Sequence, residues 1–547
     1  MKLKRIVCSG TVLWSMMLAA CAAAEEAAGE AAAEVVEAAT EAVQASGGFL
    51  DGVAKVNDAV NGVVWGVPAL VLLGFVGILM TVLTKVFQVS HFGHWMKKTI
   101  GAVFKDKHVT SHTKDKSISQ FQSLCTALAA TVGTGNIVGV SGAIITGGPG
   151  AVFWMWVIAF FGMMTNYSEN VLGIFYRRKN ANGEWSGGAM YYLRDGLGSR
   201  KNCRTLGKVL AWLFSLFCLI AAFGIGNMTQ VNSISENMEA VFSIPTWVTG
   251  AIVMILVGLV VVGGLKRIAA VTEKIVPFMV ILYMIGTIAI FFIHIDQFAP
   301  VFSSIFRGAF APESAAGGIV GYGMKLAIEW GMKRGVFSNE AGLGSSVMVH
   351  SNSNVKEPVK QGMWGIFEVF ADTIVVCTLT AFAILSSGLI DLNTGALAAE
   401  FANLNKNNLV ATVFEQKFGM IGSGFVAVSI ALFAFSTVLG WSHYGTKACE
   451  YLLGEKRTIP YRVIFVLLVF GGATMGDNLA WDLADTFNGL MMIPNLIGVI
   501  ALSGEVAKIT KNYVSRNLRG QKIAPLYSAF PDIQAEQEAA PDSGDEA

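Results

Sequence analysis

Two apolar stretches of this 547-residue chain contain residues that interrupt helices and bind ligands. The first includes Thr131-Val132-Gly133-Thr134-Gly135-Asn136, and the second runs from Phe337 to Ser346 as FSNEAGLGSS. Glycine and asparagine weaken a helix. The free N–H groups of a half-helix suit a carboxylate, and its freed carbonyl groups suit a cation or an ammonium group. We expect Thr131, Gly133, Thr134, Gly135 and Asn136 to bind a small zwitterion, with close helix packing as the alternative.

A polar face further along the chain supplies another candidate. Gly226, Asn227 and Gln230 lie at positions i, i+1 and i+4 of an apolar segment, so they share one side of a helix. A glutamine that faced lipid would leave its amide group unpaired, so Gln230 is expected to face the interior. We assign Gln230 to substrate contact, and a hydrogen bond between helices is the alternative.

An aromatic and hydroxyl face recurs in a later apolar segment. Phe433, Thr437 and Trp441 are spaced by four residues and Ser436 is adjacent. We interpret Phe433 and Trp441 as walls that keep a pocket small. The hydroxyl groups of Ser436 and Thr437 are hard oxygen ligands of the type that Na⁺ accepts. The alternative is an ordinary packing stripe with hydroxyl groups bonded back to their own helix.

Ionisable side chains inside apolar segments need partners and are functional candidates. Glu368 and Asp372 have i, i+4 spacing, and Arg334 and Glu340 flank the second stretch. With Glu169 they are expected to serve in structural pairing or gating more than in direct substrate contact.

The elements that position these residues are membrane helices. Apolar residues make up 54% of the chain and charged residues 14%, against about 25% charged residues in soluble domains. Eleven apolar windows of suitable length follow the N-terminal region. They lie near residues 63–86, 121–146, 149–176, 207–231, 245–264, 273–295, 317–347, 361–389, 408–445, 460–476 and 480–505. The sequence predicts an all-α polytopic membrane protein with 11 spans.

Charge placement predicts the orientation. Lys and Arg cluster after the first, third, fifth, seventh and ninth windows and in the tail at 506–547, whereas the opposite loops are mainly acidic. The positive-inside rule then places the N-terminus outside and the C-terminus in the cytoplasm of a bacterium, with the spans in its inner (plasma) membrane. The acidic end from Asp532 to Ala547 is expected to be a solvated part of the cytoplasmic tail.

The N-terminal region has the composition of an export signal. Basic residues precede a short apolar run within residues 1–21, which is typical of a secretory signal. Lipidation at Cys21 and ordinary cleavage nearby remain open. Residues 22–60 are expected to form an Ala/Glu-rich periplasmic arm.

The two interrupted segments open two runs of five windows, at about 121–295 and 317–505, within a transmembrane domain at 61–505. Five is an odd number, so the second run has inverted topology. Interrupted segments at matching positions of inverted halves indicate a transporter binding site. The first window is then an extra N-terminal helix.

Several strings resemble the alanine or glycine:cation symporter family. They are residues 133–139 (GTGNIVG), 147–156 (GGPGAVFWMW), 187–192 (GGAMYY), 224–227 (GIGN) and 334–345 (RGVFSNEAGLGS). The resemblance implies a LeuT-type 5+5 inverted repeat and symport of alanine or glycine with Na⁺, or H⁺ in some members. It also implies a Na⁺ site where the ninth window faces the first interrupted helix, with Val132, Ser436 and Thr437 as candidates.

Other functions receive less support. No GxxxxGK[ST] phosphate loop indicates ATP drive, and no HExxH or GxSxG motif indicates a hydrolase, so we expect neither an enzyme nor an organic cofactor. The net charge of +1 gives no reason to expect nucleic acid. We expect alanine or glycine and membrane lipid as partners, and no obligate protein partner is evident. An amino-acid sensor on a transporter scaffold and a passive ion channel remain alternatives. Alanine versus glycine, L versus D, ion stoichiometry and oligomeric state stay open.

Overall fold

A computed structural model describes residues 49–112, 116–310, 320–475 and 478–539. The predicted signal segment at 1–21 and most of the Ala/Glu-rich arm lie outside the described residues. The described chain is mainly helical, with a short hairpin formed by β1 (Arg178–Lys179) and β2 (Trp185–Ser186). The prediction of an all-α membrane protein is confirmed at this level.

Helices lie at each of the eleven predicted windows. In chain order they are α2 (Phe49–Val64) with α3 (Val67–Leu83); α8 (Gln120–Thr131) with η1 (Thr134–Asn136) and α9 (Val138–Gly147); α10 (Gly150–Phe175); α12 (Arg204–Phe223) with η4 (Gly224–Met228) and α13 (Thr229–Phe242); α14 (Thr246–Val261); α15 (Gly264–Ile293); α17 (Val320–Asn339) with α18 (Val347–His350); α19 (Pro358–Val369) with η6 (Phe370–Cys377) and α20 (Thr378–Ser386); α22 (Met420–Leu453); α23 (Thr458–Ala473); and α24 (Asn478–Tyr513). Within the described ranges, seven helices are long and apolar enough to cross a membrane, or eight if α8 and η1–α9 form one bent span. The count of eleven spans stays a prediction, and so does the placement of the first helix outside the two five-helix repeats.

The first interruption follows from local chemistry. Ser119 and Gln122 form a reciprocal cap at the start of α8. The helix ends at Thr131, because Val132 and Gly133 adopt non-helical backbone angles. The chain resumes at Thr134 with its axis bent by 59°. The predicted break in this segment is therefore confirmed.

The second interruption is longer. After α17 ends at Asn339, Glu340, Gly342 and Gly344 have φ angles of 55°, 96° and 73°. Two of these three left-handed positions are glycines, which adopt such angles without a steric penalty. The Asn339 side chain accepts a hydrogen bond from Ala341 N–H at 3.0 Å and steadies the turn. The predicted break after Phe337 is also confirmed.

Helices at matching positions of the two runs pack against each other. The first helices meet as α9 against α17, the second as α10 against α19, the third as α12 and α13 against α22, and the fourth as α14 against α23. The residues of both interruptions, 132–137 and 339–346, are buried, so both lie inside the helix assembly rather than at its edge.

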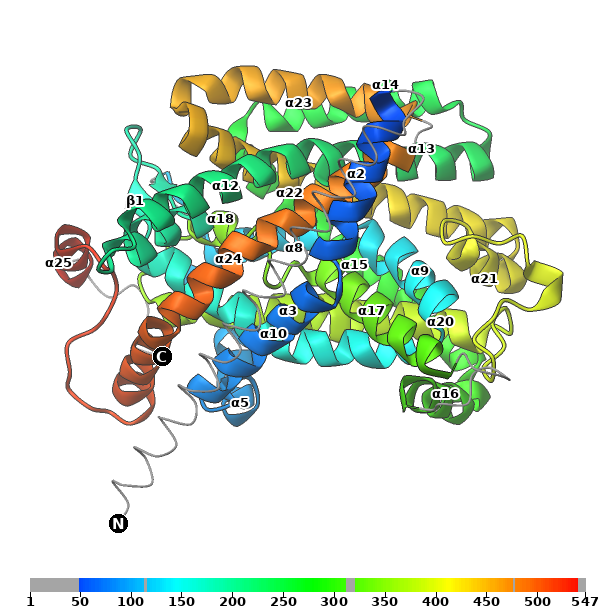
Figure 1. Ribbon diagram of the computed structural model, residues 1–547, viewed down its shortest axis with the longest axis horizontal. Coiled ribbons are helices and arrows are strands. Elements are labelled where there is room, and N and C mark those ends of the chain that lie inside the picture. Colours follow the sequence, from blue (N-terminus) through cyan, green and yellow to red (C-terminus); the bar gives the residue numbers. More distant parts are fainter. Residues whose placement is uncertain (1–48, 113–115, 311–319, 476–477, 540–547) are drawn as a thin grey trace, which may run out of the picture.

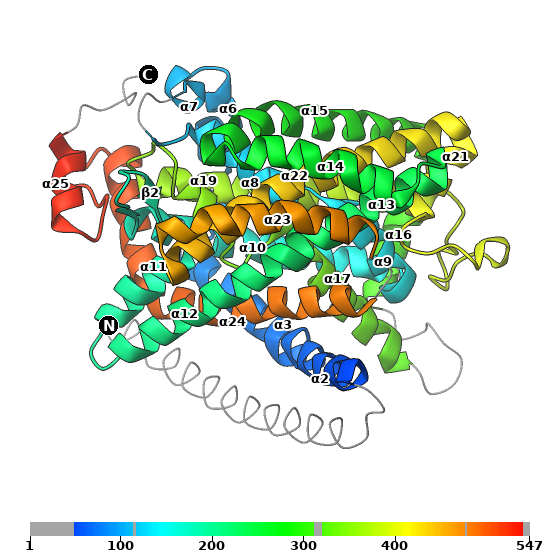
Figure 2. The ribbon, with the colours of Figure 1, turned by 90° about the horizontal axis from the view of Figure 1, so that it is seen from above.

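The molecule has two distinct ends. Figures 1 and 2 show β1–β2 and α25 (Pro531–Ala539) at one end of the long axis, and α16 (Phe298–Phe310) with α21 (Leu409–Phe418) at the other. Basic loops gather at the first end, where Lys116, Lys266 and Lys456 line one cavity. We call this the basic end.

The expected solvated tail is wrong in one respect. The chain just before it docks, since Ala529 N–H donates to the Phe175 carbonyl at 2.9 Å, and within it Ile533 and Gln537 of α25 are buried. The acidic side chains of Asp532, Glu536 and Glu538 are exposed, as expected. The guanidinium of Arg178 lies 3.9 Å from the centre of the Phe530 ring. The apolar side chains between the tail's acidic residues explain this docking, because they remove apolar surface from water.

Candidate functional site

A closed cavity of about 20 Å³ lies between the two interrupted helices. Its lining comes from α8, η1, η4, α13, α17, α22, α24 and the second interruption. The lining residues are Ala130, Thr131, Gly133, Thr134, Gly135, Ile225, Gln230, Phe337, Glu340, Thr437, Trp441 and Asn488. Seven of the nine residues predicted to contact substrate are brought together here.

Asn136 is not among the lining residues. Its Oδ1 accepts a hydrogen bond from Gly133 N–H at 2.9 Å, and its Nδ2 donates to Asp372 Oδ1 at 2.6 Å. The Asp372 carboxylate also accepts from the hydroxyl groups of Ser338 and Thr373, at 2.8 and 2.7 Å. Asn136 and Asp372 thus lie outside the cavity lining and stabilise the backbone of the first interruption. Asp372 also links it to Ser338 at the end of α17.

Gln230 lies in the interior and lines the cavity. The Thr134 hydroxyl donates to Gln230 Oε1 at 3.0 Å, and Gln230 Nε2 donates to the Ile225 carbonyl at 3.0 Å. The second bond ties the side chain to η4, a π-turn, which is a feature that often occurs at functional sites. The expected interior position and the alternative of a hydrogen bond between helices are therefore both observed.

The α22 face contributes two of its three predicted residues to the cavity. Thr437 and Trp441 line it, whereas the Phe433 ring packs edge-on against Tyr283 with ring centres 5.3 Å apart. A four-residue step exceeds a full helical turn, and over eight residues the side chains diverge by about 80°. This divergence turns Phe433 away from the cavity that Trp441 borders.

Oxygen atoms converge beside the first interruption. The hydroxyl groups of Ser436 and Thr437 donate to the Phe433 carbonyl at 2.8 and 3.0 Å, and Ser436 Oγ lies 3.3 Å from the Ala129 carbonyl oxygen. A Cβ atom at Gly133 would lie 2.4 Å from Thr437 Oγ1, so only glycine allows this approach. Carbonyl and hydroxyl oxygens are hard ligands that suit a hard cation.

Trp441 closes one side of the cavity and is fixed by a glycine. A Cβ atom at Gly226 would lie 2.3 Å from Trp441 Cβ, so the π-turn and α22 touch without side chains between them. The Trp441 ring also packs edge-on against Tyr444, with ring centres 5.4 Å apart.

Glu340 lines the cavity directly. It is 3% exposed and accepts a hydrogen bond from the Ser345 hydroxyl within the second interruption. Among the described residues, no Lys, Arg or His forms an ion pair with it. Its expected structural or gating role stays a prediction, and its position beside the cavity also allows substrate contact.

The other predicted charged residues lie away from the cavity. Glu169 accepts from Asn495 Nδ2 at 2.5 Å, and the same amide donates to the Gly342 carbonyl at 2.8 Å. Glu368 pairs with His350 Nε2 at 3.0 Å, and the Arg334 guanidinium lies 5.1 Å from the Trp330 ring centre. Each of these side chains contacts protein groups away from the cavity, and the expected role in structural pairing or gating stays a prediction.

Four lining residues were missed by sequence reasoning. Ala130 and Phe337 adjoin the interrupted segments, and Ile225 belongs to the GIGN string, so nearness to those motifs could have indicated them. Asn488 comes from α24, and its Oδ1 is buried without a hydrogen bond in the described chain. A buried amide in an apolar helix was the available signal.

A multi-pass helical membrane protein with a closed polar cavity between two interrupted helices belongs to the class of secondary transporters. Residues 50–526 match the profile of the sodium:alanine symporter family, and the chain belongs to this family. The predicted family is confirmed, and the protein is a transporter rather than an enzyme.

Two relatives in sequence support the same assignment. The chain is 43% identical over 464 residues to the sodium/alanine symporter AgcS of Methanococcus maripaludis, covering 85% of this chain and 98% of that protein. It is 36% identical to the probable sodium/glutamine symporter GlnT of Bacillus subtilis, covering 84% and 91%. The crystal structure of MhsT in complex with L-phenylalanine aligns with a TM-score of 0.47 and 14% identity, covering 73% of this chain and 99% of that one.

Proposed function

We propose that this protein is a sodium-coupled symporter that moves alanine or glycine into the cell by alternating access between two inverted five-helix repeats. The observation that carries the proposal is the closed cavity that both interrupted helices border. The pairing of helices at matching positions of the two runs supports the repeat. The names of the sodium/alanine and sodium/glutamine relatives support an amino acid and Na⁺ as the transported pair.

The two ends of a zwitterion match the two sides of the cavity. Thr134 and Gly135 are the first residues of η1, and the first N–H groups of a helical segment have no partner within it. They are positioned to donate to the substrate carboxylate, with the partial positive charge of the half-helix behind them. Across the cavity, the Glu340 carboxylate is positioned to accept from the substrate ammonium group.

The coupling ion fits the oxygen cluster beside the first interruption. The Val132 carbonyl follows the end of α8, where Ser436 Oγ approaches the Ala129 carbonyl and the Thr437 hydroxyl packs against Gly133. The carbonyl groups of Ala129 and Phe433 add two further oxygens to the candidate set. The described residues contain no group of three or more His, Cys, Asp or Glu suited to a metal ion, and Na⁺ does not require one.

The size of the substrate follows from the walls. Trp441, Phe337 and Ile225 border a cavity of only about 20 Å³. This volume holds little more than one water molecule, so any amino acid requires these walls to move apart. The bulky walls, together with the name of the sodium/alanine relative, support alanine or glycine over glutamine.

The test is uptake by proteoliposomes that contain the purified protein. We expect alanine or glycine to accumulate only with an inward Na⁺ gradient, and glutamine to compete weakly. An equivalent response to a proton gradient alone would assign H⁺ as the coupling ion. Binding without uptake would favour a sensor, and single-channel current without amino acid would favour a channel.

A further inference from the structure

A second and larger cavity opens at the basic end, with a volume of about 790 Å³. It lies between the α14–α15 turn, the α22–α23 turn and the β1–β2 hairpin. Its charged lining consists of Lys116, Lys266, Lys447, Lys456, Arg462, Glu184, Glu450 and Glu455, together with His443. None of these residues lines the closed cavity between the interrupted helices, so the two sites are separate.

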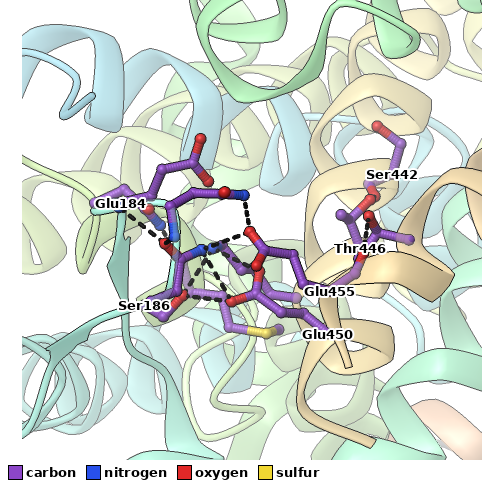
Figure 3. A network of polar contacts seen from close by, with 12 residues as sticks. Glu184, Ser186, Ser442, Thr446, Glu450 and Glu455 are labelled. Carbon is purple, nitrogen blue, oxygen red and sulfur yellow. Dashed lines mark hydrogen bonds and ion pairs between the residues drawn. The ribbon is translucent and has the colours of Figure 1, made fainter. Parts of the chain in front are cut away.

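Two of the carboxylates are engaged within the protein (Figure 3). Glu450 accepts from Lys447 Nζ at 2.9 Å and from the Ser186 hydroxyl at 2.8 Å. Glu455 accepts from the side-chain amides of Asn180 and Asn182. These contacts fix the hairpin on the end of α22. The whole lining carries five Lys and Arg side chains against three carboxylates, so the cavity has an excess of positive charge.

Arg462 is the central feature of this lining. Its guanidinium is half-buried, and no described residue accepts a hydrogen bond from it, although the Glu184 and Glu450 carboxylates lie near enough to attract it. A Cβ atom at Gly264 would lie 3.5 Å from Arg462 Nη1, and Gly264 has a φ of 71°. The guanidinium therefore lies against this turn, and both line the cavity. A partly desolvated guanidinium without an acceptor is unfavourable, and its planar fork matches the oxygens of a phosphate group.

The rim of the cavity is apolar on its outer side. Val262 and Ile459 belong to the lining and are 70% and 68% exposed. They stand at the ends of α14 and α23, whose outer faces continue as exposed apolar side chains such as Leu259 and Val463. An anion that enters here therefore has hydrocarbon surface directly beside it, as a lipid head group requires. Basic pockets between membrane helices at the cytoplasmic side bind anionic lipid head groups.

We propose that this cavity binds the head group of an anionic phospholipid from the leaflet at the basic end. The phosphate accepts hydrogen bonds from the Arg462 guanidinium, Lys456 adds charge at the rim, and the acyl chains lie along Val262 and Ile459. The bound lipid bridges the α14–α15 turn and the α22–α23 turn.

The test uses the full-length protein, stripped of lipid in detergent and examined by native mass spectrometry. Phosphatidylglycerol, phosphatidylcholine and inorganic phosphate are added separately. We expect bound phosphatidylglycerol in clear preference to phosphatidylcholine. Arg462→Gln should weaken phosphatidylglycerol binding by about tenfold or more, as expected for loss of charge-assisted hydrogen bonds. Arg457→Gln is the matched control, because Arg457 is exposed in the same turn but lies outside the lining, and it should keep wild-type binding.

Three results would overturn the proposal. They are equal binding of both lipids, equal losses in the Arg462→Gln and Arg457→Gln chains, and inorganic phosphate that displaces the lipid at a similar concentration. The last result would identify a site for a soluble anion. If Arg462→Gln does not fold, Lys456→Gln replaces it. A selective loss of phosphatidylglycerol then supports the proposal, and unchanged binding refutes it.

Discussion

Among the described residues that line the closed cavity, Glu340 carries the only carboxyl group. If it accepts from the substrate ammonium group, Glu340→Gln removes a charge-assisted hydrogen bond worth about 1.5–3 kcal/mol. We expect the apparent alanine affinity in transport assays to fall by about tenfold to a hundredfold. Glu368→Gln is the control, because Glu368 is equally buried but pairs with His350 away from the cavity. Equal effects of both substitutions on alanine affinity would contradict the assigned role.

Trp441 and Phe433 provide a second test at this scale. Trp441→Ala should admit larger amino acids such as leucine, measured as competition against labelled alanine uptake. Phe433→Ala should instead lower thermal stability, by about 3–5 kcal/mol of unfolding free energy, without a wider substrate range. If the Phe433→Ala protein accepted larger amino acids, Phe433 would have to be counted as part of the cavity wall.

Helical spacing predicted some side-chain positions and misplaced others. It put Gln230, Thr437 and Trp441 in the interior, where they line the cavity. It could not show that Phe433 diverges from the shared face, because the error in a four-residue repeat accumulates along a helix. Asn488 comes from a distant helix, and no local pattern connects it to the rest of the site.

At the scale of elements, the first interruption depends on a close approach between α8 and α22. Gly133→Ala would place a methyl group 2.4 Å from the Thr437 hydroxyl oxygen. We expect loss of Na⁺-stimulated alanine uptake with the protein still folded. Gly142→Ala in α9 is the matched control, since its Cβ would meet only ordinary contacts at 3.7 Å, and it should retain uptake. Normal Na⁺ dependence in the Gly133→Ala protein would exclude the proposed ion site.

The β1–β2 hairpin gives an element-scale test of stability. Lys447 forms an ion pair with Glu450 at 2.9 Å, and the two side chains are 5% and 12% exposed. Removing one partner leaves a buried charge unpaired, which is more destabilising than removing both. Lys447→Met alone should therefore lower the thermal midpoint more than Lys447→Met with Glu450→Gln. Additive losses in a double-mutant cycle would mean that the pair is not coupled.

Sequence reasoning succeeded for elements that depend on local composition. Glycine and asparagine located both interruptions, because they disfavour helix wherever they occur. The docking of the tail before α25 was not predicted, since Ala529 and Phe530 contact Phe175 and Arg178, far away in sequence.

At the scale of the whole molecule, the orientation in the membrane is testable. The proposed topology puts Thr394 outside and Arg457 in the cytoplasm, and both are exposed. In intact cells, a membrane-impermeant maleimide should label the Thr394→Cys protein above the wild-type background. The Arg457→Cys protein should become labelled only after the membrane is permeabilised. The reverse pattern would invert the assigned orientation.

The docked tail contacts the β1–β2 hairpin, and a deletion can test whether it protects the hairpin from proteolysis. The family match ends at residue 526, yet Phe530 and Glu536 contact Arg178 and Lys179 at the hairpin. Deleting residues 527–547 should leave alanine uptake intact, because the closed cavity is distant from these contacts. It should accelerate trypsin cleavage after Arg178 or Lys179, as followed by gel electrophoresis. Unchanged cleavage would show that the tail does not protect the hairpin.

The contact between Gly226 and Trp441 has an evolutionary consequence. A side chain at position 226 and an indole at position 441 would occupy the same space, so neither position is free to change alone. Relatives that accept bulkier solutes through a smaller residue at 441 should be the ones that tolerate alanine or serine at 226. These two positions should therefore covary across the family and divide its members by the size of their cargo.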